Sequence, residues 1–157
     1  MQIATIEFAR NVLNLKEAHS VEFSPETPHP VIALLDEQQN ITNKGGPMRL
    51  GSQPCKLTPE SIAATLYNSN EINARHRHRY EFNNQYKKDF EKNGLVFSGE
   101  NTKNQLMETI ELTDHPWFIG VQYHPEYKST VEKPHPLFIG FVNAVIKECI
   151  VKDSSSN

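Results

Sequence analysis

The sequence predicts an α/β fold, an open sheet covered by helices, because segments with strand and with helical periodicity follow one another along the chain. Residues 75–82 alternate between two kinds of side chain, as a strand with two different faces does. Residues 137–149 place apolar side chains at helical spacing. A length of 157 residues is enough for one domain with its own core.

The first half of the chain predicts two helices and two extended segments. Apolar residues at helical spacing predict a helix over 3–13, with Asn14 as its stop. The apolar run 31–35 is short enough for a buried strand, and Gly45-Gly46-Pro47 predicts a turn before the next extended segment. Thr58-Pro59-Glu60 predicts the start of a second helix, with the Thr58 hydroxyl as its cap.

The second half of the chain predicts four strands and two helices. A strand over 75–82 places four charged side chains on one face: Arg75, Arg77, Arg79 and Glu81. A helix from about Asn84 to Asn93 follows. Three further strands are predicted, over 95–97, 105–112 and 117–123. The last helix is expected to bury its apolar stripe, Cys149 included.

Composition points to a globular protein of the cytoplasm. The net charge of −3 gives no general attraction to nucleic acid or to anionic membranes. No apolar run approaches the ~20 residues of a membrane span, and the first residues lack the pattern of a signal peptide. The two cysteines form no disulfide framework. We therefore expect a cytoplasmic domain over 1–150 and a disordered polar tail over 151–157, with neither nucleic acid nor membrane as a partner.

A candidate for proton transfer stands at the end of the strand predicted over 117–123. His124-Pro125-Glu126 places an imidazole and a carboxylate two residues apart. A carboxylate can fix the tautomer of a histidine, and that histidine can then activate a nucleophile. Taken alone, the same tripeptide is also typical of a simple turn.

The run Arg75-His76-Arg77-His78-Arg79 admits two further interpretations. A basic patch of this kind can bind nucleic acid, but the chain is acidic overall and the run is short. His76 and His78 lie on one strand face and could ligate zinc with a third residue from elsewhere. No pair of Cys or His residues has the spacing of a metal site, so we expect no metal.

Several segments resemble one enzyme family. Residues 120–127, Gly-Val-Gln-Tyr-His-Pro-Glu-Tyr, resemble the signature strand of the class I (triad-type) glutamine amidotransferases. Four other segments resemble the amidotransferase domain of the CTP synthases: 1–12, 18–23, 45–51 and 75–83. The resemblance extends from Met1 to about Lys147, so nearly the whole chain is similar to part of this domain.

The resemblance implies a fold and a set of site residues. The fold is an incomplete class I glutamine amidotransferase, a flavodoxin-like open sheet with helices on both faces and its N-terminal strands missing. His124 is implied to be the general base and acid of a Cys-His-Glu triad, and Glu126 its orienting carboxylate. Gln2, Glu22 and Arg79 are implied to bind L-glutamine. Arginine suits this role because it can fork two hydrogen bonds onto a carboxylate.

The implied activity is hydrolysis of glutamine to supply ammonia for the ATP-dependent amination of UTP to CTP. The nucleophilic Cys and the synthetase domain, where ATP and Mg act, are expected upstream of Met1. This chain is therefore expected to hold no cofactor and to be inactive alone, since neither Cys55 nor Cys149 has a nucleophile's setting. The synthetase domain is the expected partner, and the parent enzyme is expected to be a homotetramer.

Two other functions stay open: a non-catalytic pseudo-amidotransferase that binds a partner, and an amidotransferase domain of another biosynthetic pathway. His19, Val21 and Pro47 depart from the family pattern and bear on the geometry of the glutamine site, because Val21 lacks a hydroxyl and Pro47 lacks a backbone N–H. Missing strands would also leave an unpaired edge and exposed apolar surface, so we expect the chain to associate unless a partner covers them.

Overall fold

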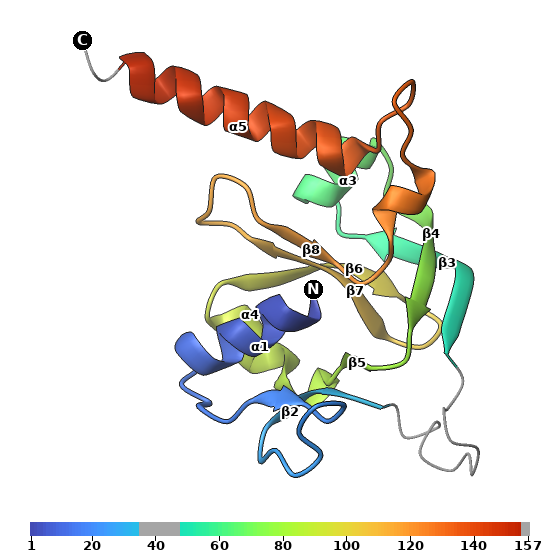
Figure 1. The fold of residues 1–157 in the computed structure, drawn as a ribbon, viewed down its shortest axis with the longest axis vertical. Helices are drawn as coiled ribbons and strands as arrows, with labels where there is room; N and C mark the ends of the chain where they lie inside the picture. Colours follow the sequence, from blue (N-terminus) through green and yellow to red (C-terminus); the bar gives the residue numbers. More distant parts are fainter. Residues whose placement is uncertain (35–47, 155–157) are drawn as a thin grey trace.

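The computed structural model describes residues 1–34 and 48–154, and their strands form two sheets (Figure 1). The larger sheet is antiparallel, with the strand order β4-β3-β6-β7-β8. Its strands are β3 (Arg49–Leu57), β4 (Glu71–His78), β6 (Leu95–Asn101), β7 (Leu106–Leu112) and β8 (Ile119–Val121). The smaller sheet has the order β1-β2-β5, formed by β1 (His19–Ser20), β2 (Pro30–Ala33) and β5 (Glu81–Phe82). Among the described strands, only β1 and β2 pair in parallel.

Helices cover both sides of the larger sheet, so the predicted α/β class is confirmed. Figure 1 shows α1 and α4 on one side of the sheet and α3 and α5 on the other. The helices are α1 (Gln2–Asn11), α3 (Ile62–Tyr67), α4 (Lys87–Lys92) and α5 (Pro136–Ser154), with 3-10 turns η1 (Asn84–Tyr86) and η2 (Pro125–Lys128). The turn predicted at Gly45-Gly46-Pro47 lies outside the described residues.

The main core lies between the helices α1 and α4 and the sheets. Phe8 of α1 stacks on Phe90 of α4 with ring centroids 5.2 Å apart. The ring centroids of Phe82 and Phe97 are 4.5 Å apart. Such aromatic pairs add about 0.5–1.5 kcal/mol each to the apolar burial itself. The predicted first helix ends at Asn11, and Asn14 adopts a left-handed conformation with φ 58°, which turns the chain towards β1.

The start of α1 lies against the edge strand β8. A Cβ atom on Gly120 would stand 3.4 Å from the Cα of Met1 and 2.9 Å from the Cγ1 of Ile110. Burial lowers the pKa of the Met1 amino group below its ordinary value. Gly120 therefore lets the first residue pack directly on the sheet.

The second helix begins later than predicted. The cap of α3 is Ser61, whose hydroxyl accepts a hydrogen bond from the Ala64 N–H at 3.0 Å, and not Thr58. The reason is a turn at Glu60, which has φ 66°, so the chain becomes helical only at Ile62. The buried Glu111 carboxylate accepts from the N–H groups of Ile62 at 2.9 Å and Ala63 at 3.0 Å.

The final helix differs from the prediction in two respects. Its apolar stripe was expected to be buried with Cys149, but Cys149 is exposed and only the first turns of α5 pack on α3. The chain also stays helical through residues 151–154, which were expected to be disordered. No Gly or Pro follows Gly140, so nothing in the local sequence stops the helix before its serines.

Candidate functional site

His124 and Glu126 form a hydrogen-bonded pair just after β8. The Nδ1 atom of His124 lies 2.6 Å from Oε1 of Glu126, and the side chains are 35% and 53% exposed. The backbone N–H of His124 donates to the Arg75 carbonyl at 2.9 Å, which ties this segment to β4. Because a carboxylate can only accept, Nδ1 carries the proton and Nε2 is left to accept one, as a general base requires.

The charge of Glu126 is stabilised by this pairing. Partial burial raises the pKa of the Glu126 carboxyl, but the hydrogen bond that it accepts from His124 outweighs this effect, so the pKa is lowered. The imidazole also stacks on Tyr127, with ring centroids 5.1 Å apart and planes 21° apart. Both contacts restrict the orientation of the ring.

A cavity of about 240 Å³ gathers the three residues that the sequence assigned to glutamine binding. Gln2 from α1, Glu22 from the loop after β1 and Arg79 from the turn after β4 all line this space, here named the Arg79 cavity. The Nε atom of Arg79 is buried and has no hydrogen-bond partner among the described residues. A buried donor without a partner is costly, so it favours an acceptor group in this cavity.

One wall of the Arg79 cavity is fixed by two amides that bond a single carbonyl. The Tyr80 carbonyl accepts from Gln2 Nε2 at 2.9 Å and from Gln122 Nε2 at 2.8 Å. Gln122 stands two residues before His124, so the same strand end positions the cavity wall and the imidazole. Sequence reasoning missed Gln122, although it lies inside the segment that resembles the family signature.

Buried charges lie directly behind this wall. Arg49 contacts Glu81 at 3.2 Å and Glu108 at 2.7 Å, and both carboxylates are almost completely buried. His78 Nε2 lies 2.7 Å from Glu81. The prediction that Glu81 shares a face with the arginines is wrong. β4 ends at His78 and β5 begins at Glu81, so the intervening turn breaks the alternation and directs Glu81 inward.

Burial shifts the pKa values of this network. Burial raises the pKa of Glu108 to about 7, although the hydrogen bond and charge of Arg49 oppose the shift. Burial also lowers the pKa of His76 to about 3, and the charges of Arg49, His78 and His124 act in the same direction. His76 is therefore neutral near pH 7, with its Nδ1 3.5 Å from Glu108 Oε2.

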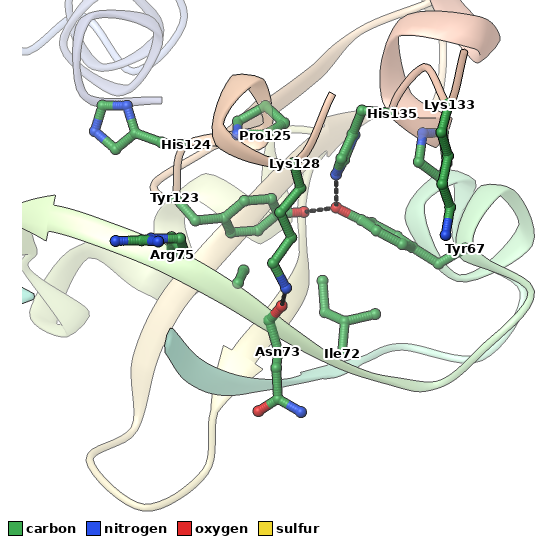
Figure 2. A pocket seen from close by; sticks show the side chains of 12 residues that line it. Tyr67, Ile72, Asn73, Arg75, Tyr123, His124, Pro125, Lys128, Lys133 and His135 are labelled. Atoms are coloured by element: carbon green, nitrogen blue, oxygen red, sulfur yellow. Dashed lines mark hydrogen bonds between the residues drawn. The ribbon is translucent and has the colours of Figure 1, made fainter. Parts of the chain in front are cut away.

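His124 lines a second space, which we name the Tyr123 cavity (Figure 2). It measures about 490 Å³ and lies between β4, η2 and the start of α5. In Figure 2 the His124 ring stands at the side of this cavity nearest the pale blue helix α1. The structure thus places His124 and the three glutamine-site residues around different cavities, joined through the strand end at Gln122.

Neither cysteine lies at either cavity. Cys55 is buried in β3, and burial raises the pKa of its thiol to about 12, so it is not a thiolate at neutral pH. Across residues 1–34 and 48–154, no group of three or more His, Cys, Asp or Glu side chains could hold a metal ion. No helix in the same ranges is long and apolar enough to cross a membrane.

Comparison with known proteins gives the family. Residues 1–144 match the model of the family described as glutamine amidotransferase class-I. The chain belongs to this family. Among class I glutamine amidotransferases it is similar to the CTP synthase of Christiangramia forsetii, with 56% identity over 144 residues, which cover 92% of this chain and 26% of that protein. It is also 53% identical over 148 residues to the CTP synthase of Geobacillus kaustophilus, covering 94% of this chain and 28% of that enzyme.

A solved structure shows the same fold. The glutaminase domain of Trypanosoma brucei CTPS, with bound acivicin, is 37% identical in sequence and superposes with a TM-score of 0.86. The match covers 94% of this chain and 57% of that domain. The amidotransferase chain described here thus spans about a quarter of the length of the curated relatives it matches.

Proposed function

We propose that this chain is part of the glutaminase domain of a CTP synthase, which hydrolyses L-glutamine and delivers ammonia for the ATP-dependent amination of UTP to CTP. One observation carries the proposal: the His124–Glu126 pair, 2.6 Å apart, stands at the strand end that also fixes the wall of the Arg79 cavity. The similarity to CTP synthases over more than nine-tenths of the chain supports this choice of pathway.

In the proposed reaction His124 takes the proton of a cysteine thiol. The thiolate attacks the side-chain carbonyl carbon of glutamine, and the same imidazole returns the proton to the departing ammonia. Water, activated by His124, then cleaves the thioester to release glutamate. Glu126 holds the tautomer and stabilises the imidazolium. Arg79 is proposed to bind the substrate carboxylate and Glu22 its ammonium group, with Gln2 shaping the cavity beside them.

The thiol is proposed to come from residues outside this chain, and so is the synthetase domain that binds ATP and Mg. Cys55 supports this, because it is buried and its thiol is protonated at neutral pH. We further propose a homotetrameric, cytoplasmic parent enzyme.

A chimaeric enzyme tests the proposal. The matched 144 residues of the Christiangramia forsetii CTP synthase are replaced by this chain, and CTP formation is measured with glutamine and with ammonium chloride. We expect glutamine-dependent CTP formation. His124→Ala is expected to reduce that rate at least about 100-fold, because the acid–base group is lost, while ammonia-dependent synthesis continues.

The ammonia reaction is the control for folding and for the synthetase domain. Arg79→Met is expected to raise the KM for glutamine, whereas the control Lys88→Met, which removes an exposed cation of α4 that lines neither cavity, is expected to leave it unchanged. A chimaera that uses ammonia but not glutamine would instead favour a pseudo-amidotransferase.

A further inference from the structure

The Tyr123 cavity carries positive charge that the proposed glutamine reaction does not use. Arg75, Lys128 and Lys133 line it, and no Asp or Glu does. Lys128 Nζ donates to the Asn73 carbonyl at 2.6 Å, and the Arg75 guanidinium lies 5.8 Å from the centre of the Tyr127 ring. Within the described part of the chain, none of these three cations forms an ion pair. In a chain of net charge −3, this is a local excess of positive charge.

The floor of the cavity is neutral and its hydrogen bonds are satisfied. The Leu137 N–H donates to Nδ1 of His135 at 3.3 Å, so the ring proton stands on Nε2, which donates to the Tyr67 hydroxyl at 3.1 Å. The Tyr67 hydroxyl in turn donates to the Tyr123 hydroxyl at 3.1 Å, as Figure 2 shows. Burial lowers the pKa of His135 and raises that of Tyr67 to about 12, which keeps both groups uncharged.

Glu126 is close in sequence to the residues of the cavity but forms no ion pair with its cations. Glu126 is engaged by His124 and does not line the cavity. The positive charge of the cavity therefore comes from Arg75, Lys128 and Lys133. The rings of Tyr67 and Tyr123 and the side chain of Ile72 supply apolar lining in the same space. A volume of about 490 Å³ is far more than a bare inorganic ion fills and falls in the range of small-molecule sites.

We propose that the Tyr123 cavity binds an organic anion, attracted by the combined positive charge of Arg75, Lys128 and Lys133 around the cavity, with an apolar ring or chain against Tyr67 and Tyr123. The acidic group is a carboxylate or a phosphate monoester, since both suit these donors. A bound anion shares its cavity with His124, which also lines it. The site is separate from the Arg79 cavity and does not depend on the proposed glutaminase activity.

Titration of the isotope-labelled chain with phenyl phosphate tests the site. We expect saturable changes in the amide and ring resonances of Tyr123 and His135, with smaller changes at His124. At matched ionic strength, inorganic phosphate lacks the apolar body and phenol lacks the charge, so each is expected to bind at least about tenfold more weakly. Phenylacetate, titrated in parallel, distinguishes a preference for carboxylate from one for phosphate.

The double variant Arg75→Gln, Lys133→Met is expected to weaken phenyl phosphate binding at least about tenfold. Lys88→Met combined with Lys92→Met removes two exposed cations from α4, so it is the control matched in net charge and is expected to bind normally. The inference is overturned if phenyl phosphate gives no saturable change, if phenol binds as well, or if the double variant of the cavity binds like this control. Unchanged folding of each variant is checked by its amide spectrum.

Discussion

Two buried carboxyl groups, Glu81 and Glu108, share one guanidinium, that of Arg49. A buried pair of this kind adds little stability over an apolar core, but removing one partner leaves a charge in the interior at a cost of about 3–5 kcal/mol. His76 adds an unusual feature, because its two ring nitrogens are buried and have no hydrogen-bond partner among the described residues. At this scale the network acts as a rigid support for the turn that carries Arg79.

The pKa shifts of Glu108 and His76 predict opposite dependences of stability on pH. The pKa of Glu108 is raised to about 7 in the folded chain. Its contribution to the free energy of unfolding is therefore complete below about pH 4.5 and is lost as the pH rises through 7. The pKa of His76 is lowered to about 3, so its contribution is complete above about pH 6.5 and is lost as the pH falls. Between about pH 4.5 and pH 6.5 the two effects on stability oppose each other.

His76→Leu should therefore expose the effect of Glu108. We expect its free energy of unfolding to rise, relative to that of the wild type, as the pH falls from about 7 to about 5. When the free energy of unfolding is plotted against pH, the slopes for His76→Leu and for the wild type should differ by up to about 1.4 kcal/mol per pH unit. Urea unfolding at several pH values measures it, and adding Glu108→Gln should abolish the gain. Equal slopes for His76→Leu and the wild type would refute the assignment.

At the scale of elements, α5 is held to the rest of the molecule at a close contact. A Cβ on Gly140 would lie 2.5 Å from Cη2 of Trp117 and 2.8 Å from Cδ2 of Leu66. Glycine is otherwise unfavourable inside a helix, by about 1 kcal/mol relative to alanine. Its presence here is explained by the approach of α5 to α3.

Gly140→Ala is expected to destabilise the chain by about 1 kcal/mol, because the strain of overpacking, about 1–3 kcal/mol, exceeds the gain in helix propensity. Asn143→Ala, an exposed site on the same helix, is the control and should be neutral or slightly stabilising. Urea unfolding followed by circular dichroism gives both values. A stabilised Gly140→Ala variant would show that α5 does not pack on Trp117 as described.

The elements also show what the sequence could and could not predict. Local patterns located the first helix, the strands β6, β7 and β8 and the last helix, whereas the strand predicted over 75–82 begins earlier, at Glu71, and ends at His78. They failed where a tertiary contact decides the outcome. The cap of α3 is set by Ser61 and by Glu111, almost fifty residues away, and Glu81 turns inward because a two-residue turn precedes it. The exposure of Cys149 likewise depends on what packs against α5, which its own stripe does not reveal.

The sequence predicted the candidate site residues themselves, but not the residues that hold them in position. The segment 120–127 and the arginine run predicted His124, Glu126 and Arg79 as site residues, because both segments resemble patterns of a known family. Gln122 and Arg49 were missed as supporting residues, since amide-to-carbonyl bonds and buried ion pairs join distant segments and leave no periodic trace.

At the scale of the whole molecule, one face of α5 presents apolar side chains to solvent along most of the helix. Between 41% and 53% of each of the following is exposed: Phe138, Ile139, Phe141, Val142, Val145 and Ile146. An apolar surface of this extent is typical of an interface. The isolated chain is therefore expected to associate with itself at rising concentration.

Phe141→Glu combined with Val145→Glu should weaken self-association at least about tenfold, because two apolar contacts are lost and two charges are added. Asn143→Glu combined with Lys147→Gln makes the same change in net charge without removing apolar surface and serves as the control. Sedimentation velocity over a range of concentrations measures association. A wild-type chain that stays monomeric throughout would contradict the expectation.

The packing of Met1 on Gly120 has a practical consequence for handling the protein. The segment that precedes Met1 in the proposed parent domain would fold against the sheet, but a flexible affinity tag fused there begins at the contact of Met1 with β8, close to the strand end that bears His124. Such a fusion should lower the melting temperature, whereas one attached beyond residue 157 should leave it unchanged. Purification handles therefore belong at the carboxyl end.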